Sequence, residues 1–290
     1  DVALAKDSAL MIDHSTADTL YLNADTLFSY AVDSVDKVVE AFRNVRVFRK
    51  DLQAVCDSAR YETRDSVLHL MKMPILWSDN QQITGDTIRI FSVNGAVERL
   101  QIINSAFVCQ QEDSTRFNQL AGKEITAYVA DGELYRVDVR GNAQSLFFPR
   151  EADSTMIGMN QTESSFLTVY LKKQKIDRIV LYPAPTGVMT PLDQVTAESM
   201  YLPNYSWQVA IRPQKWEDVF ARPVRTVAAT SKRRRRATES EPKETTSEVN
   251  TNKPSETNTT PVSSGSSPRP SMPNIGGSSS TLKTNALGGK

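Results

Sequence analysis

The sequence predicts an all-β protein, an elongated stack of antiparallel strands. Three observations lead to this prediction. A short motif, in which an acidic residue precedes alternating apolar and polar residues, recurs at intervals of 29 to 39 residues. Asn-Gly or Asp-Gly follows two of the copies, and a second alternating run then returns. Such a repeat indicates one supersecondary unit that buries its apolar face on its neighbours.

Acidic residues mark the start of each copy. The markers are Asp25, Asp57, Asp86, Glu124 and Glu163. Because the acid recurs at one phase of the repeat, we expect it to belong to a structural turn and to accept backbone N–H groups. Paired carboxylates that cleave a polysaccharide are the alternative.

The N-terminal part has a less regular pattern. Residues 10–12 already have strand character, and the stretch VDKVVEAFRNVRVF that begins at Val35 fits either a strand or a short helix over 35–41. The first residue is Asp1, from which we expect a signal peptide, and an earlier part of the domain, to lie outside this chain.

Clear alternation predicts three successive hairpins in the middle of the chain. The expected strands are 87–93, 96–103, 125–129, 134–139, 167–171 and 176–182. Asn94-Gly95 and Asp131-Gly132 predict type I′ turns, which need positive φ at both central residues. Gly141-Asn142 predicts a further turn.

An arginine occupies the same place in each return strand of these hairpins. The three are Arg99, Arg136 and Arg178. We expect them to face solvent, as charges on alternating strands usually do, and a role in binding anionic groups is the alternative.

Beyond the hairpins, prolines and a glycine in 183–191 predict that the repeat breaks. The following stretch, residues 192–207, is expected to cap the stack, with a short helix over 194–200. We expect residues 212–220 (RPQKWEDVF) to form an ordered strap anchored by Trp216.

The composition divides the chain into a folded domain, residues 1–225, and a tail, residues 226–290, expected to be disordered because it is too polar to bury a core. Residues 231–290 contain 10 Lys and Arg and 5 Glu, so the rest of the chain has a net charge of −5. An acidic body argues against nucleic-acid binding. The basic cluster 232–236 predicts an electrostatic tether to acidic surfaces such as a membrane, with a nuclear localisation signal or a nucleic-acid patch as alternatives.

No catalytic, cofactor or metal motif is present, so we expect neither enzymatic activity nor a cofactor. His14 and His69 lack metal-ligand spacing, and no GxSxG, Walker or GxGxxG sequence occurs. Cys56 and Cys109 fit either two buried free thiols or a single disulfide. The sequence contains no run of 18 or more apolar residues, the length that a membrane-spanning helix would need.

Four stretches carry a resemblance to a known family. They are PILWSDNQQITGDTIRIF (74–91), NSAFVCQQEDSTRFNQLAGKEI (104–125), ELYRVDVRGNAQSLFF (133–148) and TESSFLTVYLKKQKIDRIVLYPAPTGVMTPLDQ (162–194). Over about residues 15–220 the chain resembles the OstA-like (organic solvent tolerance) family, which is related to the periplasmic bridge LptA and to the N-terminal domain of LptD. The compact LptA proteins lack the PLDQ and RPQKWEDVF segments, and the tail has no counterpart in the family.

The resemblance implies an elongated, twisted and V-shaped β-jellyroll of stacked antiparallel strands, open along one side, that shields lipid A acyl chains in an apolar groove. It further implies a non-enzymatic periplasmic protein of lipopolysaccharide transport and outer-membrane assembly. Its partners would be lipopolysaccharide and, through edge-strand pairing, other transport proteins or a second copy. A secreted or surface-exposed β-solenoid, acting as an adhesin or carbohydrate-binding module, is the alternative, and a polysaccharide-degrading solenoid is a third.

The alternation also predicts which residues would line a groove. The aliphatic side chains at one phase of the repeat are Ile88, Ile90, Leu100, Ile102, Ile125, Val137, Val139, Leu167, Val169, Ile179 and Leu181. Stacking would align them into a continuous lipid-binding lining, because alternate residues of a strand share one face. The alternative is that they pack a closed core against one another.

Overall fold

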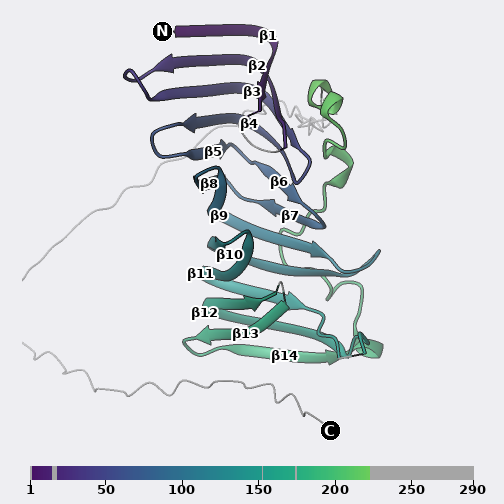
Figure 1. Ribbon diagram of the computed structural model, residues 1–290. Helices are drawn as coiled ribbons and strands as arrows, with labels where there is room; N and C mark the ends of the chain where they lie inside the picture. Colours follow the sequence, from purple (N-terminus) through teal and green to yellow (C-terminus); the bar gives the residue numbers. More distant parts are fainter. Residues whose placement is uncertain (1, 15–17, 152, 174, 223–290) are drawn as a thin grey trace, which may run out of the picture. The chain divides into compact units, whose positions relative to one another are not determined.

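The computed structural model describes residues 2–14, 18–151, 153–173 and 175–222, all within one compact unit. Nearly all of this part is antiparallel strand (Figure 1), so the predicted all-β fold is confirmed. The predicted tail 226–290, its basic cluster 232–236 and the domain boundary at 225 lie outside the described residues.

The elements follow one another along the chain with short connections. The strands are β1 (Val2–Asp13), β2 (Leu20–Ala31), β3 (Lys37–Arg49), β4 (Leu52–Glu62), β5 (Val67–Met71), β6 (Ile75–Ser78), β7 (Gln81–Thr84), β8 (Thr87–Val93), β9 (Ala96–Gln111), β10 (Phe117–Ala130), β11 (Glu133–Phe147), β12 (Gly158–Lys172), β13 (Lys175–Tyr182) and β14 (Thr186–Pro191). Three short 3₁₀ helices come last: η1 (Leu192–Gln194), η2 (Val209–Ile211) and η3 (Trp216–Phe220).

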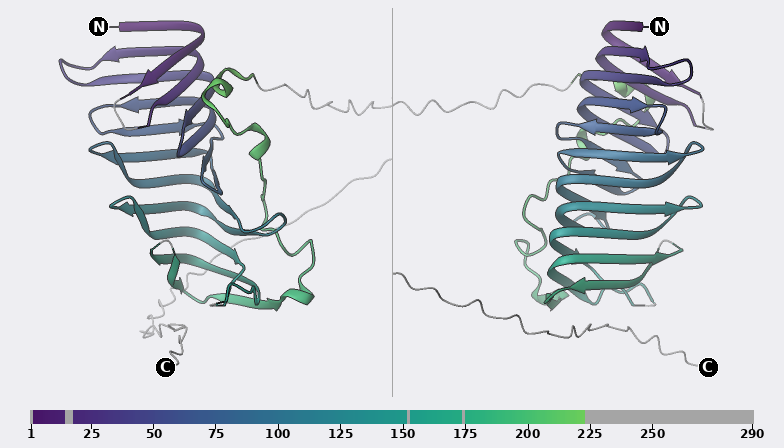
Figure 2. Two further views of the ribbon diagram at one scale, coloured as in Figure 1. Left: turned by 45° about the vertical axis from the view of Figure 1, so that its right-hand side comes forward. Right: turned by 90° about the vertical axis from the view of Figure 1, so that its left-hand side faces the viewer.

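All the strands belong to one 14-stranded sheet whose order follows the sequence, β1-β2-β3-β4-β5-β8-β9-β10-β11-β12-β13. The short strands β6 and β7 pair between β4 and β9, and β14 pairs with β12. Most strands therefore pair with a neighbour in the chain, as antiparallel hairpins allow, and β5–β8, β4–β6, β7–β9 and β12–β14 are the exceptions. Figure 2 shows the strands stacked in this order.

Pairs of residues with positive φ bend the sheet along one line. These pairs are Asp7-Ser8, Arg43-Asn44, Lys72-Met73, Asn104-Ser105 and Gly141-Asn142. Four of them coincide with register shifts inside a strand, and Lys72-Met73 separates β5 from β6. Extra residues of this kind form β-bulges that kink a strand. We call this line the corner, and it divides the sheet into two walls.

The two walls are defined by their strand segments. The hairpin wall contains residues 2–6, 26–42, 58–71, 87–103, 124–140, 166–172 and 175–182, and it carries the predicted hairpin turns. The strap wall contains residues 9–13, 20–24, 45–56, 75–84, 106–121, 143–147, 158–163 and 186–191. In the hairpin wall Asn94-Gly95 and Asp131-Gly132 have φ values from 52° to 80°, so both predicted type I′ turns are confirmed.

Three predictions about local structure are wrong. Gly141-Asn142 is a bulge inside β11 and not a turn, because positive φ serves a bulge as well as a turn. The repeat does not break at 183–191, since β13 and β14 pair with β12 on either side of the corner. Residues 194–200 do not form a helix beyond the single turn of η1. The ambiguous stretch 35–41 is strand from Lys37 onward, where β3 begins.

Two apolar clusters hold the sheet together. The larger cluster fills the space between the walls and draws on both, from Leu22 and Val47 to Ile125 and Leu167. The smaller one lies on the outer face of the strap wall, where Phe107, Cys109, Phe117, Leu146, Phe148 and Met159 pack against the segment after β14. Removing these side chains from water is the main stabilising contribution to the fold.

That last segment, residues 192–222, is the C-terminal strap, and it crosses the strap wall in reverse strand order (Figure 1, green). Gln119 of β10 binds the backbone of Met200 and Leu202, and Gln82 of β7 binds that of Ser206 and Gln208.

Nearer the N-terminus, Gln53 of β4 accepts from the Arg212 side chain, and Arg46 of β3 donates to the carbonyls of Ile211 and Asp218. The ordered strap is therefore confirmed, although it covers a wall instead of capping the stack. Trp216 stacks on Tyr21 but is 43% exposed, whereas Val219 is fully buried, so Val219 is the apolar anchor.

Candidate functional site

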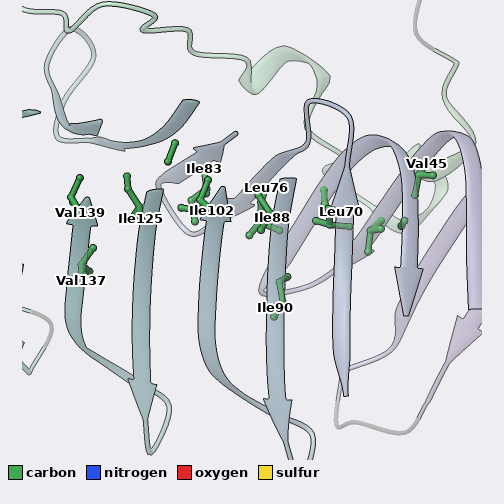
Figure 3. Packing of buried hydrophobic residues seen from close by; sticks show 14 of the residues in the cluster. Val45, Leu70, Leu76, Ile83, Ile88, Ile90, Ile102, Ile125, Val137 and Val139 are labelled. Atoms are coloured by element: carbon green, nitrogen blue, oxygen red, sulfur yellow. The ribbon is translucent and has the colours of Figure 1, made fainter. Parts of the chain in front are cut away.

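The inner face of the hairpin wall brings all the predicted lining residues together in two adjacent rows. The row next to the corner contains, in cross-strand register, Ile88, Ile102, Ile125, Val139, Leu167 and Leu181. The row nearer the hairpin tips contains Ile90, Leu100, Ala127, Val137, Val169 and Ile179. We call these the corner row and the tip row. Figure 3 shows members of both on neighbouring strands.

Burial differs between the two rows. Ile88, Ile102 and Ile125 of the corner row have no exposed surface, so they belong to a closed core. In the tip row Leu100, Ala127 and Ile179 are only partly buried. The closed-core alternative therefore describes most of the corner row, and only the tip row and the positions beyond it can meet a ligand without rearrangement.

The strap wall supplies the opposite side of this space, which the sequence prediction missed. Its inner row contains, in register, Leu22, Val47, Ala54, Leu76, Ile83, Val108 and Leu120. Leu76 and Ile83 lie close to Ile88 and Ile102 of the other wall (Figure 3). Short alternating runs in 52–56, 75–84 and 106–110 do predict strands there. Nothing in these runs, however, indicates which wall the strands occupy.

A cavity of about 160 Å³ opens between the walls in the N-terminal half of the sheet. Leu20, Leu52, Leu68, Ile90 and Val97 contribute to its lining, with others of the same kind from both walls. Polar side chains, including those of Asp13, Arg49 and Arg60, also border it. An apolar interior with a charged border suits a ligand that has an apolar part and a polar part.

Toward the C-terminal end the inner face of the strap wall becomes polar. After Leu120 the inner row continues with Ser145, Thr162 and Gly187. The hydroxyls of Ser145 and Thr162 lie 2.6 Å apart and share a hydrogen bond. The hairpin wall stays aliphatic as far as β13, so both walls are apolar only from β2 to β10.

The acidic markers lie at or beside the corner, as expected of a structural position, but within the described residues four of them accept hydrogen bonds from side chains and not from backbone N–H groups. Asp25 accepts from the side chains of Asn44 and Arg222, and Asp57 accepts from Lys72. Glu124 accepts from Gln101, and Glu163 from Gln144. The expected backbone bonds are wrong for these four acids, because a polar side chain of an adjacent strand or segment lies beside each of them.

These acids do not gather in one place, since they occupy separate strands along the corner. In the described part of the chain no group of three or more His, Cys, Asp or Glu could hold a metal ion. His14 contacts Thr19, and His69 lies on the outer face opposite Arg89. Burial, and then the charge of Arg89, lower the pKa of His69.

Both cysteines are free thiols, so the disulfide alternative is wrong. Cys56 lies against the inner cluster and Cys109 in the outer one. Burial raises the pKa of each thiol to about 12, so neither is a reactive thiolate at neutral pH.

The fold and the site define a two-walled antiparallel β protein whose interior is aliphatic and opens between the walls. No helix in the described ranges is long and apolar enough to cross a membrane. No family model matches the chain, and no curated protein matches it. Among solved structures it is similar to that of LptH from Pseudomonas aeruginosa, the LptA homologous periplasmic component of the conserved lipopolysaccharide transport device. The identity is 16% and the TM-score 0.36, over 49% of this chain and 97% of that one.

Proposed function

We propose that this chain is a non-enzymatic lipopolysaccharide-binding protein of lipopolysaccharide transport and outer-membrane assembly. It would act in the periplasm and shield acyl chains between its two walls, with no cofactor. The observation that carries this proposal is the continuous aliphatic inner face, which runs in register across the hairpin wall and opens into a cavity bordered by charged side chains.

The energetics suit an acyl chain. Each methylene removed from water contributes about 0.8 kcal/mol, so a chain laid along several strands binds through many small contacts and needs no specific polar group. The partly buried tip-row residues Leu100, Ala127 and Ile179 provide such contacts on β9, β10 and β13, and neighbouring strands lie about 4.8 Å apart. Sugars and phosphates of the same ligand would remain at the polar border.

The two ends of the sheet suggest how the protein would join partners. Among the described strands, β1 pairs only with β2, and β13 and β14 pair only with β12. Each end thus presents backbone groups that another strand can bind. Val2 and Leu4 of β1 and Val188 of β14 are exposed beside these edges. The proposed partners are other transport proteins or a second copy of this chain.

Site-specific photo-crosslinking tests the groove. A photoreactive amino acid is placed at Ile90, Leu100 or Ile179 of the tip row, in protein produced in a lipopolysaccharide-containing host. Arg64 is the control, because it is exposed in the turn between β4 and β5, pairs with Asp33 and Asp36 and lies outside the lining. We expect lipopolysaccharide adducts, detected by immunoblot and mass spectrometry, at the three tip-row positions and none at Arg64.

A position in the corner row serves as a second control in the crosslinking experiment. Val139 is almost fully buried, so a crosslinker there should give little adduct even if the groove binds lipid. Circular dichroism confirms that each variant keeps its strands. Absence of adducts at all three tip-row positions in folded protein would remove the lipid-carrier proposal.

A further inference from the structure

A second row of side chains crosses the outer face of the hairpin wall, away from the groove. In cross-strand register it contains Phe91, Arg99, Tyr128, Arg136, Tyr170 and Arg178. Aromatic residues and arginines alternate on six successive strands, β8 to β13. We call this row the arginine–aromatic ladder. The sequence indicated its arginines but not their aromatic partners.

The rings hold the guanidinium groups in place. The guanidinium carbon of Arg99 lies 4.0 Å from the centre of the Phe91 ring, and that of Arg178 lies 4.4 Å from the Tyr170 ring. Arg136 lies between Tyr128 and Tyr170, at 5.4 and 5.9 Å. A guanidinium stacked on a ring keeps its N–H donors free at its edge, ready to bind a carboxylate or phosphate through two bonds.

The positive charge of the ladder is only partly balanced. Arg136 makes two hydrogen bonds with Asp138, at 2.7 and 2.9 Å. Arg99 and Arg178 make no ion pair within the described ranges, where each lies over an aromatic ring. Two of the three guanidinium groups therefore lack a counter-charge among these residues, which favours an anionic ligand at the ladder.

The spacing of the arginines indicates the kind of anion. They lie on every second strand, so successive guanidinium groups are about 9.6 Å apart, twice the strand spacing. That interval is comparable to two sugar rings in an extended chain. We propose that the ladder binds an acidic polysaccharide, whose carboxylates or phosphates on alternate sugars pair with Arg99, Arg136 and Arg178.

Other polyanions fit less well. A nucleic acid would stack its bases on free aromatic faces, but guanidinium groups occupy faces of Phe91, Tyr128 and Tyr170. The site goes beyond the proposed function, because it lies on the opposite face of the wall. The ladder would bind a carbohydrate, as the alternative function predicts, but on a surface separate from the groove.

Titration calorimetry with size-defined oligogalacturonate, a lipid-free chain of carboxylated sugars, tests the proposal on the full chain. We expect binding to the unaltered protein and binding weaker by about tenfold or more in the double variant R99A/R178A, which loses two charge-assisted contacts. The matched control R64A removes an exposed arginine outside the ladder, which pairs with Asp33 and Asp36. It should retain the original affinity.

Further measurements test whether binding needs the shape of the guanidinium group or only its charge. They also test whether the ladder prefers an acidic sugar chain over a neutral one or over another polyanion. The variant R99K/R178K keeps both charges but loses the planar donors, so it should bind about as weakly as the alanine variant. A neutral maltodextrin of equal length should not bind. Equal affinity for all variants, or tighter binding of a single-stranded oligonucleotide of equal charge, would overturn the proposal. Groove crosslinking at Leu100 in R99A/R178A reports on lipid separately, so failure of one proposal does not affect the other.

Discussion

Replacing Gln82 by alanine should loosen the C-terminal strap. The Gln82 side chain is buried and makes three hydrogen bonds. Its oxygen accepts from the indole of Trp77 at 3.2 Å and from the backbone N–H of Gln208 at 2.7 Å. Its amide donates to the carbonyl of Ser206 at 2.6 Å. The substitution Q82A therefore leaves two donors and one acceptor without partners.

The expected cost follows from these three groups. Each polar group left unpaired in the interior costs at least about 1 kcal/mol, so the free energy of unfolding should fall by about 3 kcal/mol. Local opening of the strap limits this loss of stability, because water can reach the freed groups once residues 199–212 detach. The amide hydrogens of that segment should then exchange faster than those of the sheet.

Urea unfolding and hydrogen exchange measure the two effects. The control is Q81A, since Gln81 neighbours Gln82 on β7, faces the other side, is only half-buried and makes no side-chain hydrogen bond among the described residues. This substitution should change stability by no more than about 0.5 kcal/mol. If Q82A were no less stable than Q81A and exchange in 199–212 were unchanged, the bonds of Gln82 would not hold the strap.

Three further predictions concern the core, a thiol and the tail. Ile102→Ala should reduce the free energy of unfolding by about 2–5 kcal/mol, because Ile102 is fully buried in the corner row, and a loss below about 1 kcal/mol would contradict that burial. Cys109 should resist iodoacetamide at pH 8 in the native protein and react once urea unfolds it, since its pKa is raised to about 12, and equal rates would refute the burial. Its neutral thiol stabilises the fold fully below the unfolded pKa of about 9, and this contribution is lost as the pH rises toward 12. Deleting residues 231–290 should weaken binding to anionic vesicles at low salt and change little at high salt, whereas unchanged binding at low salt would exclude the tether.

The sequence predicts the hairpins of this fold better than its bends. Asn94-Gly95 specifies a tight turn because both residues accept positive φ, and alternation around it sets the register. The corner pairs Arg43-Asn44 and Lys72-Met73 contain no glycine, so local propensity does not reveal them. Packing between the two walls imposes these bends, and a single strand carries no record of that packing.

The candidate site, too, could be predicted from the sequence only in part. Alternation correctly placed the predicted aliphatic residues on one face, including Ile102 and Leu100. It could not separate the closed corner row from the tip row, because that depends on how near the strap wall approaches. Gln82 and Gln119 were missed, since a glutamine on an outer strand face looks solvent-exposed until a distant segment covers it.

The return path of the strap has a consequence for how the protein unfolds. A sheet in which strands pair almost entirely with strands near them in sequence behaves like a one-dimensional array, in which one end can fray while the other stays folded. Arg46, however, binds the carbonyl of Asp218, 172 positions away, while Gln119 binds the other end of the same segment. The strap thus links hairpins that otherwise touch only their neighbours. It should turn gradual fraying into a single cooperative transition, at the cost of a slow final step, because so long a loop closes late in folding.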